Sequence, residues 1–465
     1  MIPALTHARR RADLTRRLGG RAVLLVGTQA PLRTSPINAY PHRQDSNFLY
    51  FTGCSQPGAA ALIDAQGCTL FLQPPADDDE LWHGHVDTLE DLRLRYGVER
   101  AAALDTLEQT CQGRALVSLA VADPEATRKA ARLVGRPLEY GGDNGDSDLA
   151  DAVIAQRRRK DQDELSELRR AAAATAAAFE LAMSATRPGG NEAHVAALFN
   201  AALAARDCTN GYGSIVTVRG EVLHNPDWTN PLEAGQLLLL DGGGELRESG
   251  YGVDITRTWP VDGRFTGRQR AAYQAVLEAE EQAIAMCRPG VRYRDVHLHA
   301  ARVMARWLLD EGLLRGSLDA ALESHAAAVF FPHGVGHLLG LDTHDLEQFW
   351  DKASYAPGRS RDPHFGTAYL RMDLDLEPGF VFTIEPGFYV VPAILKNQEL
   401  RDRLGDLVDW DKAAGWADFG GIRIEDDVLC TDTSPEVLTA ATPKSIDAIE
   451  ALVGSGASAW DRLRV

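Results

Sequence analysis

Four acidic residues in the second half of the chain stand beside strongly apolar segments. Asp241 follows four consecutive leucines, and Asp254 opens a segment rich in β-branched residues. Glu385 follows a third apolar segment, and Glu425 lies within a fourth. A carboxylate in such surroundings carries a large desolvation cost unless a cation compensates it. One such acid is usually a cap or turn residue, but four together predict a cation-binding site.

Three histidines lie close together in the glycine-rich residues 331–345: His333, His337 and His344. His333 and His337 are four residues apart, as in the helical zinc-protease motif. The intervening glycines disfavour a helix and no glutamate follows His333, so that motif is excluded. A glycine-rich loop suits a crowded site in which the backbone comes close to a ligand. Structural histidines in a loop are the alternative.

Four carboxylates with one or two imidazoles form a hard, oxygen-rich donor set. Such a set favours Mn²⁺ over a thiolate-seeking metal, with Zn²⁺ or Co²⁺ as alternatives. Four acids carry enough charge to hold two divalent ions. Two metals roughly 3.5–4 Å apart can share a hydroxide and lower the pKa of water to near neutrality. The residues therefore predict metal-assisted hydrolysis without identifying the substrate.

The whole-chain properties exclude several classes of partner. A length of 465 residues suggests two or three domains. The formal charge of −18 disfavours nucleic acid and anionic membranes as partners. The apolar segments are too short to cross a bilayer, which needs roughly 20 residues. The six cysteines show no paired spacing and are expected to be reduced and buried.

The pattern of apolar runs and turns predicts an N-terminal α/β domain, residues 1–157, and a larger domain, residues 158–465. Residues 138–151 are rich in Gly and Asp, as a connecting segment is. The Arg-rich start is expected to be an ordinary helix in a cytoplasmic protein, and an organelle presequence is the alternative. The predicted strands are 22–26, 59–63, 69–72, 236–240, 255–260 and 381–384, and the predicted helices include 88–96, 161–185 and 267–286.

The order Asp241, Asp254, His337, Glu385 and Glu425, each in its local context, closely resembles the proline-specific pita-bread metallopeptidases. These comprise Xaa-Pro dipeptidase (prolidase) and Xaa-Pro aminopeptidase (aminopeptidase P). The similarity covers nearly the whole chain, and residues 42–53 resemble the noncatalytic domain of aminopeptidase P. It implies an α/β N-terminal domain of the creatinase/prolidase kind, followed by a pita-bread catalytic domain.

This resemblance also implies a role for each ligand. Asp241 would bind one metal ion and His337 the other. Asp254, Glu385 and Glu425 would contact or bridge the pair, which would share the attacking hydroxide. Glu385 would also shuttle a proton from the bridging water.

The resemblance assigns four further catalytic residues. His224 would steady the scissile carbonyl or its tetrahedral product, and His333 and His344 would flank the substrate. Arg423 matches the arginine beside the last glutamate. Donors placed where negative charge develops are an expected source of rate enhancement.

Two features depart from the family pattern. Asp241 and Asp254 are thirteen residues apart, whereas the family usually spaces them eleven apart. Two extra residues in a hairpin leave both side chains on the same face, because the strand period is two. The loop before His224, residues 218–222, is shorter than the family's Gly-Ser-Gly-containing version.

The choice between the two peptidases depends on the C-terminal half. Arg371 stands fourteen residues before Glu385, where dipeptidases place an arginine that resembles a clamp for the substrate carboxylate. The insertion at residues 392–419 is also dipeptidase-like. We therefore expect a prolidase acting on Xaa-Pro peptides, with aminopeptidase P as the alternative.

More distant alternatives are a catalytically inactive binding homologue, a metal-independent creatine hydrolase and a methionine aminopeptidase. Intact ligand positions argue against the first two, and the N-terminal domain argues against the third. Side activity on organophosphates stays open. The resemblance also implies a homodimer or homotetramer.

Overall fold

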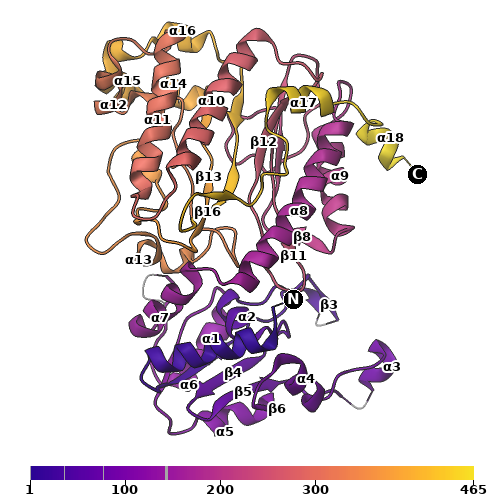
Figure 1. Cartoon of the computed structure of the whole chain (residues 1–465). Coiled ribbons are helices and arrows are strands. Elements are labelled where there is room, and N and C mark those ends of the chain that lie inside the picture. Colours follow the sequence, from indigo (N-terminus) through magenta and orange to yellow (C-terminus); the bar gives the residue numbers. More distant parts are fainter. Residues whose placement is uncertain (1, 36, 77, 142–144, 465) are drawn as a thin grey trace. The chain divides into compact units, whose positions relative to one another are not determined.

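The computed structural model describes residues 2–35, 37–76, 78–141 and 145–464. The chain divides into two compact units, which are described separately below. Unit 1 contains residues 1–167 with the short segments 248–250 and 346–353, and unit 2 contains the remainder. Figure 1 traces the chain through both units. The predicted boundary near residue 157 lies at the end of a helix and stays a prediction.

Unit 1 is built on a mixed five-stranded sheet with the strand order β6-β5-β4-β1-β7. Strand β1 pairs antiparallel with β4 and parallel with β7. Leu24 and Phe71 are fully buried in the core against this sheet. The elements are α1 (Ala4–Arg17), β1 (Ala22–Val26), β2 (Leu32–Ser35), β3 (Asn38–Ala39), α2 (Ser46–Thr52), β4 (Ala60–Asp64), β5 (Gly67–Leu72), α3 (Asp79–His83), α4 (Leu89–Tyr96), β6 (Arg100–Ala103), α5 (Leu107–Cys111), β7 (Leu116–Ser118), α6 (Pro124–Val134) and α7 (Ser147–Arg158).

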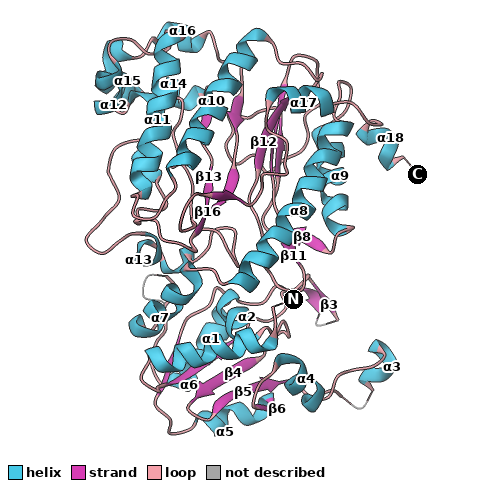
Figure 2. Cartoon of the chain, in the orientation of Figure 1, coloured by secondary structure: helices cyan, strands magenta, loops and turns pink. Residues whose placement is uncertain are grey.

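Unit 2 places short strands between helices, as Figure 2 shows. Its sheets have the strand orders β12-β10-β9, β13-β16-β17, β11-β8 and β14-β15. The elements of the first half are α8 (Gln162–Ala185, which begins in unit 1), α9 (Glu192–Ala204), β8 (Cys208–Asn210), β9 (Ile215–Thr217), β10 (Leu237–Asp241), β11 (Gly244–Leu246), β12 (Thr256–Pro260), α10 (Gly267–Met286), α11 (Tyr293–Asp310) and α12 (Leu318–Glu323).

The second half of unit 2 completes the strands and carries the C-terminal helices. Its elements are α13 (Asp351–Ser354, which begins in unit 1), β13 (Val381–Ile384), β14 (Gly387–Tyr389), α14 (Pro392–Leu395), α15 (Gln398–Leu404), α16 (Trp410–Ala414), β15 (Gly421–Arg423), β16 (Asp426–Leu429), β17 (Glu436–Val437), α17 (Ile446–Leu452) and α18 (Ala459–Leu463).

The strands and helices predicted from the sequence are present within a few residues of their expected bounds. Helix α10 begins as its sequence dictates: Thr266 and Gln269 form a capping box, each side chain bonding the other's backbone N–H. All six cysteines are buried free thiols, as expected. Among the described residues, no helix combines the length and apolar character needed to cross a membrane.

A buried charge network supports the strands of unit 2. The Arg257 guanidinium and the Asp426 carboxylate are both fully buried, and Arg257 Nη2 donates to Asp426 Oδ1 at 2.7 Å. Lys444 Nζ lies 2.7 Å from Asp426 and 2.8 Å from Glu280. Arg257 also donates to the backbone carbonyl of Glu425 at 2.6 Å. Strand β12 is thereby fixed to the segment that carries Glu425.

Removing one partner from this network should destabilise unit 2 strongly. We expect Asp426→Asn to lower the free energy of unfolding by about 3–5 kcal/mol, because Arg257 would keep a buried charge without its counter-ion. Chemical denaturation of the variant and the parent protein measures this difference. A loss below about 1 kcal/mol would mean that water reaches the network.

Candidate metal centre

The hairpin of β10 and β12 places two of the acids on one face. Asp241 pairs directly with Thr256, and Asp254 lies two residues before Thr256, so the three side chains share a face. The two arms of the hairpin lie very close together: a Cβ on Gly243 would lie 1.6 Å from the carbonyl oxygen of Val253. Only glycine allows this approach, and the thirteen-residue spacing keeps both acids together.

Backbone pairing brings the two glutamates to the same place. The backbone N–H of Glu425 donates to the Thr256 carbonyl at 3.0 Å, and the Thr256 hydroxyl donates to the Glu425 carboxylate at 2.7 Å. Strand β13 pairs with β16, and Glu385 follows β13 directly. The backbone N–H of Glu385 donates to the carbonyl of Val335, in the histidine loop, at 2.8 Å.

The glycines of the histidine loop approach protein rather than open space. A Cβ on Gly336 would lie 2.3 Å from the Thr383 carbonyl oxygen, and one on Gly334 would lie 2.8 Å from the Leu370 Cα. The sequence predicted close approach to a ligand at these glycines. In the structure they let the loop pack against β13 and the Leu370 segment, and this packing aims His337 at the acids.

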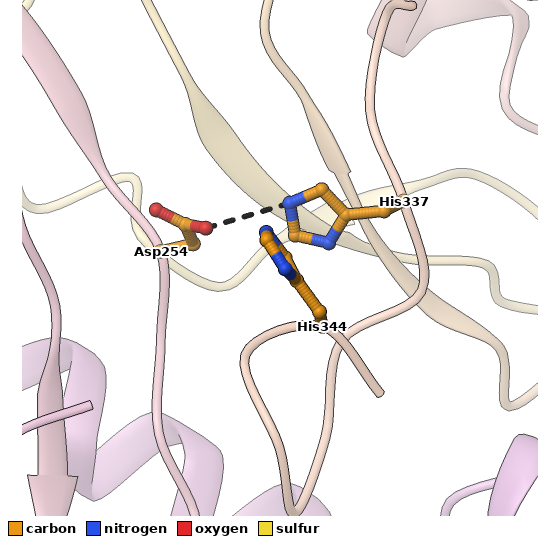
Figure 3. Close-up of side chains that lie close together, drawn as sticks. All are labelled: Asp254, His337 and His344. Carbon is orange, nitrogen blue, oxygen red and sulfur yellow. Dashed lines mark ion pairs between the residues drawn. The ribbon is translucent and has the colours of Figure 1, made fainter. Parts of the chain in front are cut away.

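The predicted ligands form three overlapping clusters. In each, the possible ligand atoms lie within 4.8 Å of one another. The clusters share Asp254, His337 and Glu425, and Figure 3 shows His337 and His344 beside Asp254. All five predicted ligands take part, together with His344. The clusters are Asp254–His337–His344, His337–Glu385–Glu425 and Asp241–Asp254–Glu425.

The tautomer of His337 suits a metal ligand. Its Nδ1 lies 3.0 Å from the carbonyl oxygen of Leu338, so this nitrogen carries the proton and donates. Its Nε2 faces the acids, 3.4 Å from Asp254 Oδ2 and 3.7 Å from Glu385 Oε1. A carbonyl that fixes one ring nitrogen and leaves the other for the ion is the usual arrangement around ligating histidines.

The negative charges of the clustered carboxylates are not fully compensated by the protein's own cations. Burial raises the pKa of Glu425 well above its usual value, and the charges of Asp254 and Glu385 raise it further. Burial likewise raises the pKa of Glu385, to about 7. Asp254 is the exception, because the bond and charge of His337 outweigh burial and lower its pKa. The donor set therefore fits divalent cations, which would replace protons here.

Two residues that the sequence reasoning missed hold the acids in place. The Tyr212 hydroxyl donates to Asp241 Oδ1 at 2.6 Å and also contacts Asp254 Oδ1. Thr256 links the Glu425 carboxylate to Arg423, whose Nε lies 3.1 Å from the threonine hydroxyl. Neither residue stands in a local pattern that predicts this role.

Arg423, Tyr389 and His333 form a chain of hydrogen bonds. Arg423 donates to Asp241 Oδ2 at 2.5 Å and to the Tyr389 hydroxyl at 3.0 Å. The hydroxyl lies 2.9 Å from His333 Nε2, and His333 Nδ1 lies 2.7 Å from the Gly334 carbonyl. Burial lowers the pKa of His333 to about 3, so the ring is neutral and Nε2 accepts from Tyr389. Its predicted contact with substrate stays a prediction.

The other predicted residues surround the acids. Arg371 Nη1 lies 2.6 Å from His344 Nε2, so the arginine donates and the imidazole accepts. Burial lowers the pKa of His344 to about 3. Partial burial and the charge of Arg423 lower the pKa of His224. These residues lie near the metal centre, and their roles toward substrate stay predictions.

The pattern of metallopeptidase family M24 matches residues 166–432. The chain belongs to this family. Its residues 7–117 match the N-terminal domain of aminopeptidase P. This M24 metallopeptidase therefore has the predicted fold class, an α/β N-terminal domain followed by a pita-bread catalytic domain, and the prediction of a metallopeptidase is confirmed.

Similar proteins align with almost the full length of this M24 metallopeptidase. A probable Xaa-Pro aminopeptidase of Aspergillus niger is 34% identical, and one of Penicillium rubens is 33% identical, each alignment covering 97% of both chains. The structure of Pseudomonas aeruginosa aminopeptidase PepP superposes with a TM-score of 0.80 at 29% identity, covering 97% of this chain and 98% of that one. Zinc-substituted E. coli aminopeptidase P in complex with product superposes with a TM-score of 0.78, with the same identity and coverage.

The free energy of unfolding of the metal-free protein should depend on pH, because the acids of the cluster lack enough positive charge beside them. The folded-state pKa of Glu385, about 7, exceeds its ordinary value of 4.5, so the folded protein holds protons that the unfolded chain has lost. The stability that protonated Glu385 contributes to the metal-free protein is therefore lost as the pH rises through about 7. Buried histidines such as His333 act in the opposite direction near pH 6.5, because the unfolded chain still binds protons there that the folded ring does not. The effect of the acids is therefore read from the difference between the metal-free and the metal-bound protein.

Thermal unfolding in EDTA and in excess Mn²⁺, at several pH values, tests this prediction. We expect the gain in melting temperature from Mn²⁺ to increase with pH, because the cation then displaces fewer protons. A gain that stays constant or shrinks would show that the acids are already ionised without metal.

Tyr212→Phe should weaken metal binding without unfolding the protein. The variant loses the donor shared by Asp241 and Asp254, and losses of this kind typically cost about 10–100-fold in metal affinity. Competition with a chromophoric chelator measures the affinity. Tyr273→Phe is the matched control, because the buried Tyr273 hydroxyl donates to the Lys444 carbonyl and contacts no ligand. Equal affinities for both variants would contradict the role of Tyr212.

Proposed function

We propose that this M24 metallopeptidase is an Xaa-Pro aminopeptidase, which releases the N-terminal residue from peptides with proline in second position. The observation that carries the proposal is that its relatives named as Xaa-Pro aminopeptidases align with 97% of this chain and 97% of their own length. These comparisons favour the aminopeptidase alternative over the prolidase expected from the sequence.

Prolidase activity stays the second candidate because of Arg371. Its guanidinium contacts His344, a member of one metal-binding cluster, so it lies close enough to bind a carboxylate at the edge of the site. In a dipeptide that carboxylate belongs to the proline itself. A longer peptide would place the next peptide bond there instead.

The metal-binding residues define the chemistry that we propose. Asp241, Asp254, His337, Glu385 and Glu425 would hold two divalent ions, with Mn²⁺ favoured by the oxygen-rich donor set. Ions bound there would supply Lewis-acid chemistry, polarising the scissile carbonyl and lowering the pKa of a water molecule. Because zinc can substitute in the E. coli relative, the identity of the metal here has to be measured.

The chain's own residues would then handle protons and charge. Glu385, beside His337 in one of the metal-binding clusters, would accept a proton from the attacking water and return it. The acceptor would be the proline nitrogen, a tertiary amide whose departure requires protonation. His224 would donate to the oxygen on which negative charge develops. Arg423 would hold Asp241 in position throughout.

The cellular compartment and the oligomeric state are also proposals. Six buried free thiols suit a reducing compartment, and we place the enzyme in the cytoplasm. We further propose a homodimer or homotetramer that acts on small Xaa-Pro peptides.

Release of alanine from Ala-Pro-Pro and from Ala-Pro by the Mn²⁺-loaded protein tests the proposed function. We expect kcat/KM for Ala-Pro-Pro to exceed that for Ala-Pro by at least about tenfold, since binding energy from the third residue contributes to the transition state. Cleavage of the dipeptide alone would identify a prolidase. Absence of cleavage with metal bound would contradict the proline specificity.

Arg371→Ala separates the two candidates further. If the arginine binds the dipeptide carboxylate, its loss should reduce Ala-Pro cleavage by about 10²-fold, as expected for a charged bidentate contact, and spare Ala-Pro-Pro. Arg264→Ala provides the matched control, because Arg264 is an exposed arginine paired with Glu450 rather than with a site residue.

A further inference from the structure

The loop that carries His224 has little structure of its own. We call residues 218–230 the His224 loop; it follows β9 and contains neither helix nor strand. Its internal bonds are few, such as Val222 N–H to the Arg219 carbonyl at 2.9 Å. A loop of this length must lose considerable conformational entropy to hold one side chain in a fixed place. The contacts that fix it therefore decide where His224 lies.

One buried carboxylate joins the two ends of the His224 loop. Glu192, at the first turn of α9, is fully buried. Its Oε1 accepts from the backbone N–H of Val218 at 2.8 Å, and its Oε2 accepts from the backbone N–H of Asn230 at 2.8 Å. The Asn230 side-chain amide lies 3.0 Å from both oxygens. The first and last residues of the loop thus meet on a single side chain.

Helix α9 provides a rigid base for this carboxylate. Asn191 caps the helix by accepting from the backbone N–H of Ala193 at 2.8 Å, and Phe199 is buried on its inner face. The Glu192 backbone N–H donates to the Asn230 carbonyl at 3.1 Å, so backbone and side chain hold the same residue. The end of the loop therefore cannot move without α9.

A second anchor fixes the middle of the His224 loop to the metal centre. A Cβ on Gly220 would lie 2.6 Å from the Gly421 carbonyl oxygen, so the two backbones are in direct contact. Gly421 begins β15, the strand that ends with Arg423. His224 thus lies between an anchor on α9 and an anchor on the strand of Arg423.

We propose that Glu192 is a positioning residue for His224: its carboxylate closes the His224 loop and sets the place of the imidazole beside the scissile carbonyl. Glu192 belongs to neither the metal ligands nor the substrate contacts predicted above. The inference rests on the proposed function only through the catalytic role of His224. The alternative is that Glu192 contributes only to the stability of the fold.

The bonding pattern explains why a carboxylate is needed. Both oxygens accept, one from Val218 N–H and the other from Asn230 N–H. A glutamine would turn an N–H₂ group toward one of these donors, which breaks that bond and leaves a buried N–H unpaired. One end of the loop would lose its side-chain bond to residue 192, while the backbone bond from residue 192 to the Asn230 carbonyl, helix α9 and the strands stay in place.

The test is a double-mutant cycle between Glu192→Gln and His224→Ala, with peptide hydrolysis as the readout. We expect Glu192→Gln alone to lower kcat/KM by about 10–100-fold, because a shift of about 1 Å in a catalytic group costs about 10²-fold. In the His224→Ala background the same change should cost less than about twofold, because its effect passes through His224. Mn²⁺ affinity should stay unchanged.

The outcomes separate the inference from the proposed function. If His224→Ala itself leaves hydrolysis unaffected, the catalytic role of His224 fails. If His224→Ala is impaired but Glu192→Gln is not, the positioning role fails. Equal losses in both backgrounds, or a loss of Mn²⁺ affinity, would show that Glu192 acts on the fold and would also overturn the inference.

Two further variants serve as a substitute for Glu192→Gln and as a matched control. Asn230→Ala removes only the side-chain amide bonds to Glu192 and should show a smaller loss with the same dependence on His224, so it replaces Glu192→Gln if that variant does not fold. Glu450→Gln is the matched control, because Glu450 also accepts a backbone N–H, that of Phe265 at 3.1 Å, and contacts no predicted site residue. It should reduce stability but not hydrolysis.

Discussion

The structure of unit 2 depends on holding four carboxylates together in a buried space. Each carries a desolvation cost, and each repels the others. The protein opposes this repulsion with Arg423 on Asp241 and His337 on Asp254, while neutral donors hold the rest, such as the Thr256 hydroxyl on Glu425. The raised pKa values of Glu385 and Glu425 show that these partners do not complete the compensation. The remaining positive charge must come from protons or from cations.

The sheet register explains how a chain can hold so unfavourable a cluster. Thr256 pairs with Asp241 across β10 and β12 and bridges to Glu425, so one threonine lies between acids from distant parts of the sequence. The backbone bonds that set these pairs are shielded from water and do not depend on the charge of the acids. The Arg257 and Asp426 network lies on the neighbouring residues of the same strands and ties them together. Rigid strands therefore carry the ligands, and the histidine loop is aligned against β13.

Much of this arrangement could be predicted from the sequence because the informative residues sit in local patterns. Asp241 and Glu385 each follow an apolar strand, and the matching strands β10 and β13 are present. Tyr212 could not be found this way, since its partners Asp241 and Asp254 are 29 and 42 residues away and nothing in its own neighbourhood is unusual. The same holds for Glu192, which reads as an ordinary first-turn acid of α9. The strand order of the sheet in unit 1 could not be predicted either, because it depends on pairing between strands that local periodicity does not specify.

Two buried charge clusters among the described residues of unit 2 differ in a way that separates support from function. In the first, Arg257 and Lys444 face Asp426 and Glu280, so positive and negative groups are equal in number and bonded at close range. In the second, four carboxylates face the Arg423 guanidinium and two imidazoles, of which His344 has a lowered pKa and accepts from Arg371. A cluster with as many cations as acids can persist without a ligand and stabilise the fold, although burial and the charge of Asp426 raise the pKa of Glu280 even there. An unbalanced one is completed by protons or by a bound cation, and here the deficit is positive charge next to oxygen and imidazole donors. The site can therefore be recognised from the uncompensated negative charge of its acids as well as from its residue types.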